Sequence, residues 1–249
     1  MQQMKGVSIS QGLAVGKIVV LTSAAAPEAQ AGTPEEELAR FQRAQQQAVR
    51  DLGALYEKAK AELGEKDAEI FSVHQLMAED EDFTDLVSEA IADGAEASEA
   101  VRQAGEQCAA MFSSMDDAYM RERAADVQDV AARIRRILRG EAETTLTGPC
   151  LIAAEELTPS QTVQFPRAFV QGFLTARGAA NSHTGILART LGVPAVSQLP
   201  VDAQLQGRTA ILNGDEGTLI LDPDEDQLRA AEAGIRARQA QREALQQLA

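Results

Sequence analysis

The chain has 249 residues, 45% of them hydrophobic, and a formal net charge of −15. That length and hydrophobic content suffice for one large domain or two modest ones, each with a buried core. The acidity argues against nucleic-acid binding, which needs clustered Lys and Arg, and the absence of Trp with only two Tyr argues against base stacking.

The motifs that are missing narrow the class of protein further. Cys108 and Cys150 have neither metal-ligand nor disulfide spacing, which suits a reducing cytoplasm. Lys17 interrupts the apolar stretch near the N-terminus, so we expect no signal peptide, and no segment approaches membrane-spanning length. Zinc, calcium and nucleotide-binding motifs are also absent. We therefore expect a cytoplasmic protein that binds no metal, membrane or nucleic acid.

The first predicted elements are a strand and a long helix. Residues 16–21 are rich in β-branched side chains and predict a β-strand, and residues 24–32 have the Ala, Pro and Gly content of a linker. Thr33, Pro34 and Glu36 then form a capping box with proline at the first helical position. The apolar spacing behind them predicts a helix that ends at Leu63-Gly64.

Four more helices are predicted from apolar side chains at helical spacing. They cover residues 67–77, 81–92, a stretch that carries residues 101–115, and residues 116–138. Residues 33–142 therefore read as an all-helical subdomain of up-and-down hairpins. It holds 25 acidic against 13 basic residues, a formal charge of −12. This acidity indicates either an ordinary solvated surface or a docking face for a basic protein.

From residue 149 onward the pattern is α/β. Short apolar runs at residues 151–154, 168–170 and 172–174 predict strands, and residues 208–212 and 218–221 predict a β-hairpin. The N-terminal strand needs a sheet, and only this region offers one. We therefore predict an α/β domain, residues 1–22 and 143–228, interrupted by the all-α insertion, residues 33–142. Residues 229–249 are expected to be a helix that connects to a further domain.

His183 is the first candidate site residue. It lies between Ser182 and Thr184, where a loop gives way to a predicted helix. The start of a helix stabilises phosphate, and an ordinary histidine is largely neutral and nucleophilic at pH 7. An imidazole here is suited to carry a phosphoryl group, but a histidine that only caps the helix is the alternative. Thr158, before Pro159, is either a plain N-cap or a hydroxyl that bonds the imidazole.

A second candidate site surrounds His74. The run from residue 71 to 77 includes Leu76 and Met77, and the acidic residues 79–82 and Phe83 follow it. Apolar side chains beside carboxylates can form a sticky, electronegative patch. Met and Phe at helical spacing can equally belong to the core.

Taken together, these residues resemble the amino-terminal half of Enzyme I of the bacterial phosphotransferase system, the phosphoenolpyruvate–protein phosphotransferases. The similarity spans nearly the whole chain. It rests on separate matches in the right order, at residues 6–16, 116–129, 157–160 and 182–196. The resemblance implies a swivelling phosphohistidine β/α domain interrupted by a helical-hairpin subdomain that binds the carrier protein HPr.

The resemblance also implies roles for individual residues. His183 would take the phosphoryl group from phosphoenolpyruvate and pass it to a histidine of HPr, in sugar uptake. Thr158 would bond the active histidine, Arg189 would lie near the phosphoryl group, and Ser182 and Thr184 would flank it. HPr would bind to eight residues: His74, Leu76, Met77, Asp80, Glu81, Asp82, Phe83 and Arg123.

In the family, phosphoenolpyruvate and Mg²⁺ bind to a following C-terminal barrel domain that also makes the homodimer contacts. This resemblance implies that the present chain is a monomeric fragment that needs no cofactor and exchanges phosphate with HPr only. Two alternatives remain: the phosphohistidine domain of a pyruvate-phosphate dikinase-like enzyme, and a docking module that binds HPr without accepting phosphate. The second is kept because Gly178, Ala179, Ala180 and Asn181 depart from the family's Gly-Gly-Arg-Thr, so an expected arginine is missing at residue 180.

Overall fold

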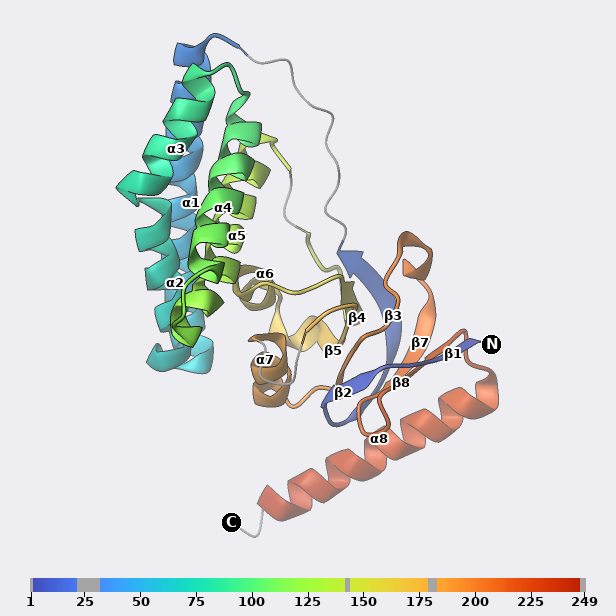
Figure 1. Ribbon diagram of the computed structural model, residues 1–249. Coiled ribbons are helices and arrows are strands. Elements are labelled where there is room, and N and C mark those ends of the chain that lie inside the picture. The colour runs from blue at the N-terminus through green and yellow to red at the C-terminus, as the bar shows by residue number, and fades with distance from the viewer. Residues whose placement is uncertain (1, 22–31, 142–143, 179–182, 247–249) are drawn as a thin grey trace. The chain divides into compact units, whose positions relative to one another are not determined.

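A computed structural model describes residues 2–21, 32–141, 144–178 and 183–246, and it divides the chain into two compact units (Figure 1). The α/β unit comprises residues 1–23 and 144–249, and the helical unit comprises residues 24–143. The first unit is thus built from two stretches of chain, and the second is inserted between them. The boundaries expected at residues 22 and 143 lie beside these divisions.

The helical unit consists of five helices in its described part. Their bounds are α1 Pro34–Leu63, α2 Glu65–Ala78, α3 Glu81–Ala92, α4 Ala97–Ser113 and α5 Ala118–Leu138. All five predicted helices are therefore confirmed, although Met115 lies beyond the end of α4. α1 begins with the predicted capping box, in which Thr33 and Glu36 bond each other's backbone N–H groups. It ends at Gly64, whose φ of +99° favours glycine.

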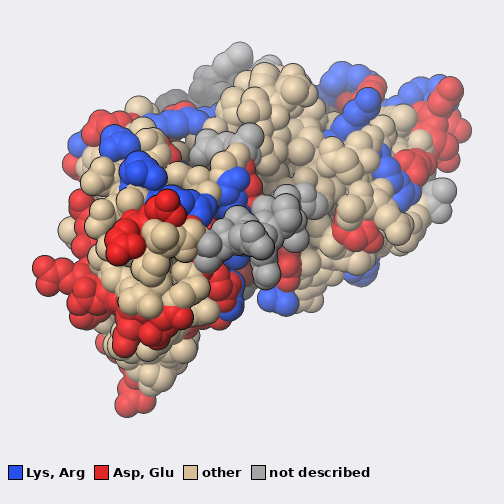
Figure 2. All heavy atoms as spheres, turned by 90° about the horizontal axis from the view of Figure 1, so that it is seen from above, with Lys and Arg blue, Asp and Glu red and all other residues tan. Residues whose placement is uncertain are grey.

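Each helix of this unit buries one apolar face and exposes a charged one. Phe41, Leu52, Phe71, Val87 and Ile134 are almost completely buried in its core. Figure 2 shows many Asp and Glu side chains on the outside of these helices, together with Lys and Arg. The negative charge is therefore carried on a solvated surface around an ordinary apolar core.

The α/β unit is a mixed eight-stranded sheet with helices around it. Its strands are β1 Gln2–Lys5, β2 Val7–Ser10, β3 Leu13–Leu21, β4 Cys150–Ala154, β5 Val170–Thr175, β6 Ala195–Ser197, β7 Thr209–Asn213 and β8 Thr218–Leu221. Its helices are α6 Pro159–Gln164, α7 His183–Leu191 and α8 Glu225–Gln246. The strand order is β1-β8-β7-β3-β4-β5-β6-β2, with β3 to β6 parallel and the remaining pairs antiparallel. The predicted N-terminal strand, here β3, and the predicted hairpin, β7 and β8, are confirmed.

One predicted strand is wrong. Residues 168–170 do not form a strand of their own, because Arg167–Phe169 is a single 3₁₀ turn that leads into β5. Pro166 starts this turn, and its carbonyl accepts a hydrogen bond of 2.8 Å from the backbone N–H of Phe169. Phe169 is partly buried and Ala168 is exposed, so this apolar run belongs to a turn rather than to the sheet.

Gly6 closes the sheet on itself. It joins β1 to β2, which stand at opposite ends of the strand order, so a single residue links the two edges. Its N–H donates to the carbonyl of Gly217 at 2.8 Å. A side chain at Gly6 would place its Cβ 2.2 Å from the carbonyl oxygen of Ser197. The close approach of two backbones therefore requires glycine at this position.

We expect Gly6→Ala to destabilise the α/β unit by about 2 kcal/mol, because the added methyl group forces one backbone away from the other. Amide hydrogen exchange of β7 and β8, followed by mass spectrometry, measures the effect in this unit alone. Gly148→Ala is the matched control, since a Cβ there meets nothing within 4 Å. Equal exchange in the two variants would contradict the role given to Gly6.

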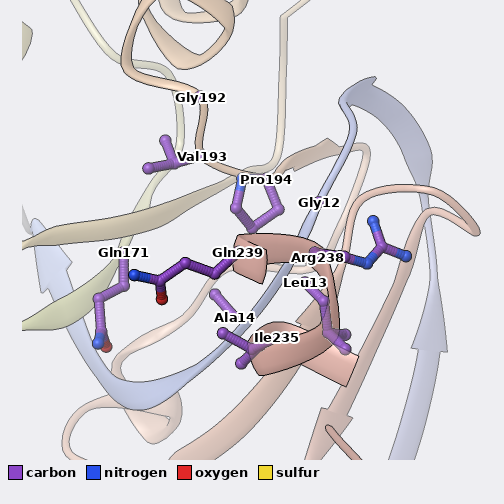
Figure 3. Close-up of a pocket in the computed structure, with 10 residues that line it drawn as sticks. All are labelled: Gly12, Leu13, Ala14, Gln171, Gly192, Val193, Pro194, Ile235, Arg238 and Gln239. Atoms are coloured by element: carbon purple, nitrogen blue, oxygen red, sulfur yellow. The ribbon is translucent and has the colours of Figure 1, made fainter. Parts of the chain in front are cut away.

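Helix α8 packs on the α/β unit. Figure 3 shows Ile235, Arg238 and Gln239 of α8 around a cavity of about 430 Å³ that Leu13 of β3 also lines. Arg238 pairs with Asp215, which also accepts a hydrogen bond of 3.1 Å from the N–H of Gly12. The segment expected to be a connecting helix from residue 229 thus begins at Glu225 and is anchored to the sheet.

Candidate active site and docking surface

Two loops of the α/β unit leave the sheet side by side. β4 and β5 are parallel neighbours, so their carboxyl ends, Ala154 and Thr175, lie at the same edge. One loop runs from β4 into α6, and the other runs from β5 towards α7. This edge is where α/β sheets commonly place their ligands. It brings together the two segments that carry Thr158 and His183.

Thr158 is the N-cap of α6, as predicted. Its Oγ1 accepts from the N–H of Gln161 at 3.3 Å, and Oε1 of Gln161 accepts from the N–H of Thr158 at 3.1 Å. This reciprocal capping box holds the threonine in one orientation. A hydroxyl that accepts one hydrogen bond still has its own O–H to donate, so Thr158 can also donate to an imidazole or a phosphoryl group.

The helix predicted at residues 184–191 is confirmed as α7, His183–Leu191. Thr184, the second residue of α7, is buried, and its Oγ1 donates to the carbonyl of Leu157 at 3.4 Å. This hydrogen bond holds α7 against the β4–α6 loop, and the expectation that Thr184 flanks the phosphoryl group stays a prediction. The start of α7 is therefore fixed beside Thr158, the neighbour of Leu157.

Arg189 is exposed on α7 and donates to the carbonyl of Ile9 at 3.3 Å, which ties the helix to β2. It lies six residues beyond the start of α7, about 9 Å along the helix axis. The structure does not describe Ser182, the side chain of His183, or residues 179–181, which differ from the family's sequence.

Three further residues shape this edge, and two of them, Glu155 and Ser197, were not singled out from the sequence. Glu155 and Arg177 form an ion pair, with Oε1 and a guanidinium nitrogen 3.2 Å apart, and both line a cavity of about 530 Å³. Ser197, buried at the end of β6, donates to the carbonyl of Gly178 at 2.9 Å. These contacts join segments that are distant in sequence, so no local sequence pattern predicts them.

The second candidate site is a corner of the helical unit between α2 and α3. Leu76 is 70% exposed, and Asp80, Glu81 and Asp82 are exposed beside it. Asp80 also caps α3, because its carboxylate accepts from the N–H of Phe83 at 3.1 Å. A cavity of about 120 Å³ opens between α2, α3, α4 and α5, and its lining combines Met77, Phe83, Met111 and Val127 with Asp80 and Asp82. This corner is an apolar hollow with acidic side chains at its rim.

The burial of two predicted docking residues corrects the sequence analysis. His74 is completely buried, so it cannot contact a partner from the surface, and Phe83, 3% exposed, can be reached only through the hollow that it lines. Phe83 forms part of the hollow, and His74 lies between two carboxylates of α5. Its Nε2 is 3.3 Å from Oδ1 of Asp126, and its Nδ1 is 3.8 Å from Oδ2 of Asp129. Both residues therefore belong to the buried core beneath the exposed side chains of this corner.

Arg123 is half-buried and serves the same network. Its guanidinium pairs with Oδ2 of Asp126 at 2.8 Å and lies over the ring of Tyr119, 4.4 Å from the centroid. Burial alone would raise the pKa of Asp126, but the hydrogen bonds and charges of His74 and Arg123 outweigh it, so this pKa is lowered below its ordinary 3.8. The carboxylate thus stabilises the folded helical unit in its charged form.

Because the folded pKa of Asp126 lies below the unfolded one, its contribution is present above about pH 4 and is lost as the pH falls through the folded value. We expect Asp126→Asn to lower stability at pH 7 and to remove about one proton from the acid dependence of unfolding. Urea unfolding followed by far-UV circular dichroism between pH 7 and pH 3 measures both. Asp85→Asn, at an exposed site on α3, is the control. Parallel stability profiles for the parent and the Asp126 variant would contradict this role.

Within residues 2–21, 32–141, 144–178 and 183–246, no three His, Cys, Asp or Glu side chains are placed to hold a metal ion. Among the helices described, none combines the length and apolar character needed to cross a bilayer.

Comparison with known proteins agrees with this architecture. Residues 5–123 match the family model described as PEP-utilising enzyme, N-terminal, and residues 146–217 match PEP-utilising enzyme, mobile domain. The chain is 35% identical over 250 residues to a phosphoenolpyruvate-protein phosphotransferase of Bacillus subtilis (strain 168), covering 97% of this chain and 44% of that protein. A Listeria innocua protein of the same name is 36% identical over 91% of this chain and 41% of its own length. The chain thus spans less than half the length of these relatives.

Solved structures are similar over nearly their full length. A solution structure of Enzyme I, described as nEIt, has a TM-score of 0.79 and 33% identity, and the match covers 94% of this chain and 99% of that one. The N-terminal domain of Enzyme 1 - Nitrogen has a TM-score of 0.64 over 92% of this chain, and its 23% identity bears on the fold alone. Fold, sequence and the order of the two matched segments agree, and the chain belongs to the Enzyme I family of PEP-utilising enzymes, where it corresponds to the amino-terminal domain.

Proposed function

We propose that the chain carries a phosphoryl group on His183 and exchanges it with a histidine of HPr, within sugar phosphotransferase uptake in the cytoplasm. The observation that supports this most directly is the joining of two loops. Thr184 bonds the carbonyl of Leu157, so the start of α7 is held beside Thr158 and its available O–H. Membership of the Enzyme I family decides against the dikinase-like alternative.

The transfer needs positioning more than covalent machinery. A lone pair on one ring nitrogen of His183 forms the new N–P bond, while the N–P bond to the carrier's histidine breaks and its electron pair returns to that nitrogen. The other nitrogen of each ring keeps its proton, so the exchange is balanced without a cofactor. The transition state of phosphoryl transfer is loose, and it is stabilised mainly by in-line alignment of the two histidines and by nearby hydrogen-bond donors. The amides at the start of α7 and the hydroxyl of Thr158 are suited to supply those donors.

The acidic corner of the helical unit is the surface we propose for HPr. Its apolar hollow and the carboxylates of Asp80, Glu81 and Asp82 suit a partner with a basic and apolar surface. Leu76 is the exposed apolar side chain nearest to those acids in the sequence, and its burial by a partner would stabilise the complex.

The test is to mix the chain with phosphorylated HPr and to record its intact mass at mildly alkaline pH. We expect a gain of one phosphoryl group that is lost on acidification, as a phosphoramidate bond requires. No gain, with binding still seen by calorimetric titration, would leave the docking module as the function.

We expect Leu76→Ala to weaken binding of HPr about tenfold, because an exposed anchor at an interface contributes about 1–2 kcal/mol. The free energy of unfolding of the Leu76→Ala variant should change little, since the Leu76 side chain is 70% exposed. Titration calorimetry measures the affinity, and Val7→Ala, an exposed apolar position of the α/β unit, is the control. An unchanged affinity in the Leu76 variant would place the docking surface elsewhere.

A further inference from the structure

We propose that Arg177 is the cation that holds the phosphoryl group on His183, and that Glu155 holds Arg177 until the group arrives. The inference rests on the proposed function and adds to it a charge exchange between two residues of the active-site edge. It starts from a physical requirement, since a phosphohistidine carries close to two negative charges and needs a nearby positive one.

The position of Arg177 follows from two hydrogen bonds to one short segment. Its backbone N–H donates to the carbonyl of Glu155 at 2.8 Å, and Thr184 donates to the carbonyl of Leu157 at 3.4 Å. Those two carbonyl groups are two residues apart, a span of at most about 7 Å. Arg177 and the first turn of α7 are therefore bound to the same three-residue stretch. We infer from this shared attachment that the long side chain of Arg177 reaches a group attached to His183.

The ion pair of Arg177 is easily exchanged. The Arg177 and Glu155 side chains are 72% and 71% exposed, and a pair so open to water contributes little to stability. A phosphoryl group offers more oxygens and more charge than a carboxylate, and guanidinium binds it in a bidentate manner. The guanidinium can therefore leave Glu155 for the phosphoryl group at small cost.

The acidic side chains around Arg177 make its positive charge important for binding a phosphoryl group. Among the described residues that line the cavity at this edge, Glu155, Glu156 and Asp202 are acidic and only Arg177 is basic. Carboxylates repel an incoming dianion, so its stability depends on the positive charge of Arg177. Arg189, expected near the phosphoryl group from the family resemblance, donates to the carbonyl of Ile9 and does not line this cavity.

The test compares single and double variants in exchange with phosphorylated HPr. We expect Arg177→Ala to lower the equilibrium constant for phosphoryl transfer from HPr to the chain about tenfold. Arg177→Lys should restore part of this loss. Glu155→Gln should act in the opposite direction and raise the constant about two- to threefold, because it weakens the competing pair. The double variant should match Arg177→Ala alone. The backbone bond from Arg177 to Glu155 persists in all of them.

The opposite signs separate charge exchange from a structural role, since a merely structural pair would lose activity in both single variants. The ³¹P chemical shift of the phosphohistidine gives a second readout, which should move in Arg177→Ala and stay unchanged in the control Arg229→Ala. Arg229 pairs with Glu225 on α8 and is similarly exposed. If the parent accepts phosphate and Arg177→Ala accepts it equally well, the inference is overturned while the proposed function stands. If the parent itself accepts none, the proposed function fails and this inference fails with it.

Discussion

Replacing His183 with alanine is expected to abolish phosphoryl exchange with HPr, reducing the rate by at least about a thousandfold. No other side chain of the described site has a nitrogen that can form the N–P bond, since Thr158 and Thr184 offer hydroxyls and Arg177 and Arg189 are permanently protonated. Intact mass after mixing with phosphorylated HPr measures the loss directly.

The variant should keep its fold and its affinity for HPr. His183 is the first residue of α7, where helix propensity matters little, and the proposed docking corner belongs to the other unit. Ile186→Ala is the matched control, because Ile186 is exposed on the same helix and should leave exchange unchanged. A His183→Ala protein that still gained a phosphoryl group would move the site to another residue, with buried His74 as the next imidazole to examine.

Replacing Glu37 with alanine is expected to destabilise the helical unit by about 3 kcal/mol. Glu37 is 2% exposed on α1, and one carboxylate oxygen accepts from the N–H of Ala97 at 2.8 Å, the first residue of α4. Both oxygens also bind the guanidinium of Arg40 at 2.8 Å, and Arg40 in turn bonds Glu96 at 3.2 Å. Removing this carboxylate leaves a helix N-terminus without its acceptor and a partly buried arginine without its main partner.

The pKa of Glu37 indicates the same stabilisation. Burial alone would raise it, but the hydrogen bonds from Ala97, Gly32 and Arg40 outweigh burial and lower it below 4.5. Urea unfolding at pH 7, followed by far-UV circular dichroism, measures the loss. Glu57→Ala, at an exposed site on the same helix, should change stability by less than about 0.5 kcal/mol. If the two variants unfold alike, the carboxylate does not join α1 to α4 as the distances indicate.

How far the sequence predicts this protein depends on how local the relevant contacts are. The capping boxes at Thr33 and Thr158 are formed within four residues, so the helix starts could be predicted from the letters alone. Strands β1 and β2 were not predicted, because each has only four residues, too few for a reliable pattern. Their conformation depends on pairing with β8 and β6, about 190 residues or more along the chain.

Burial at the docking corner shows a second limit. Closeness in the sequence and the family resemblance placed Leu76, Phe83 and His74 in one candidate patch, but neither says which face of a helix is covered by neighbouring helices. Leu76 faces solvent, whereas Phe83 and His74 are enclosed by α4 and α5. The bond from Thr184 to Leu157 and the pair of Arg177 with Glu155 were likewise invisible, because each joins segments more than 20 residues apart.

The pairing of the N-terminal strands β1 and β3 with strands late in the chain has a consequence for synthesis on the ribosome. β3 pairs with β4 only after the whole helical unit has been made, and β1 must wait for β8, which ends at Leu221. The helical unit is one continuous stretch of chain with a core of its own, so it can fold while three strands remain without partners. The nascent chain thus exposes open strand edges for most of its elongation, and we expect this interval to be when chaperones bind it.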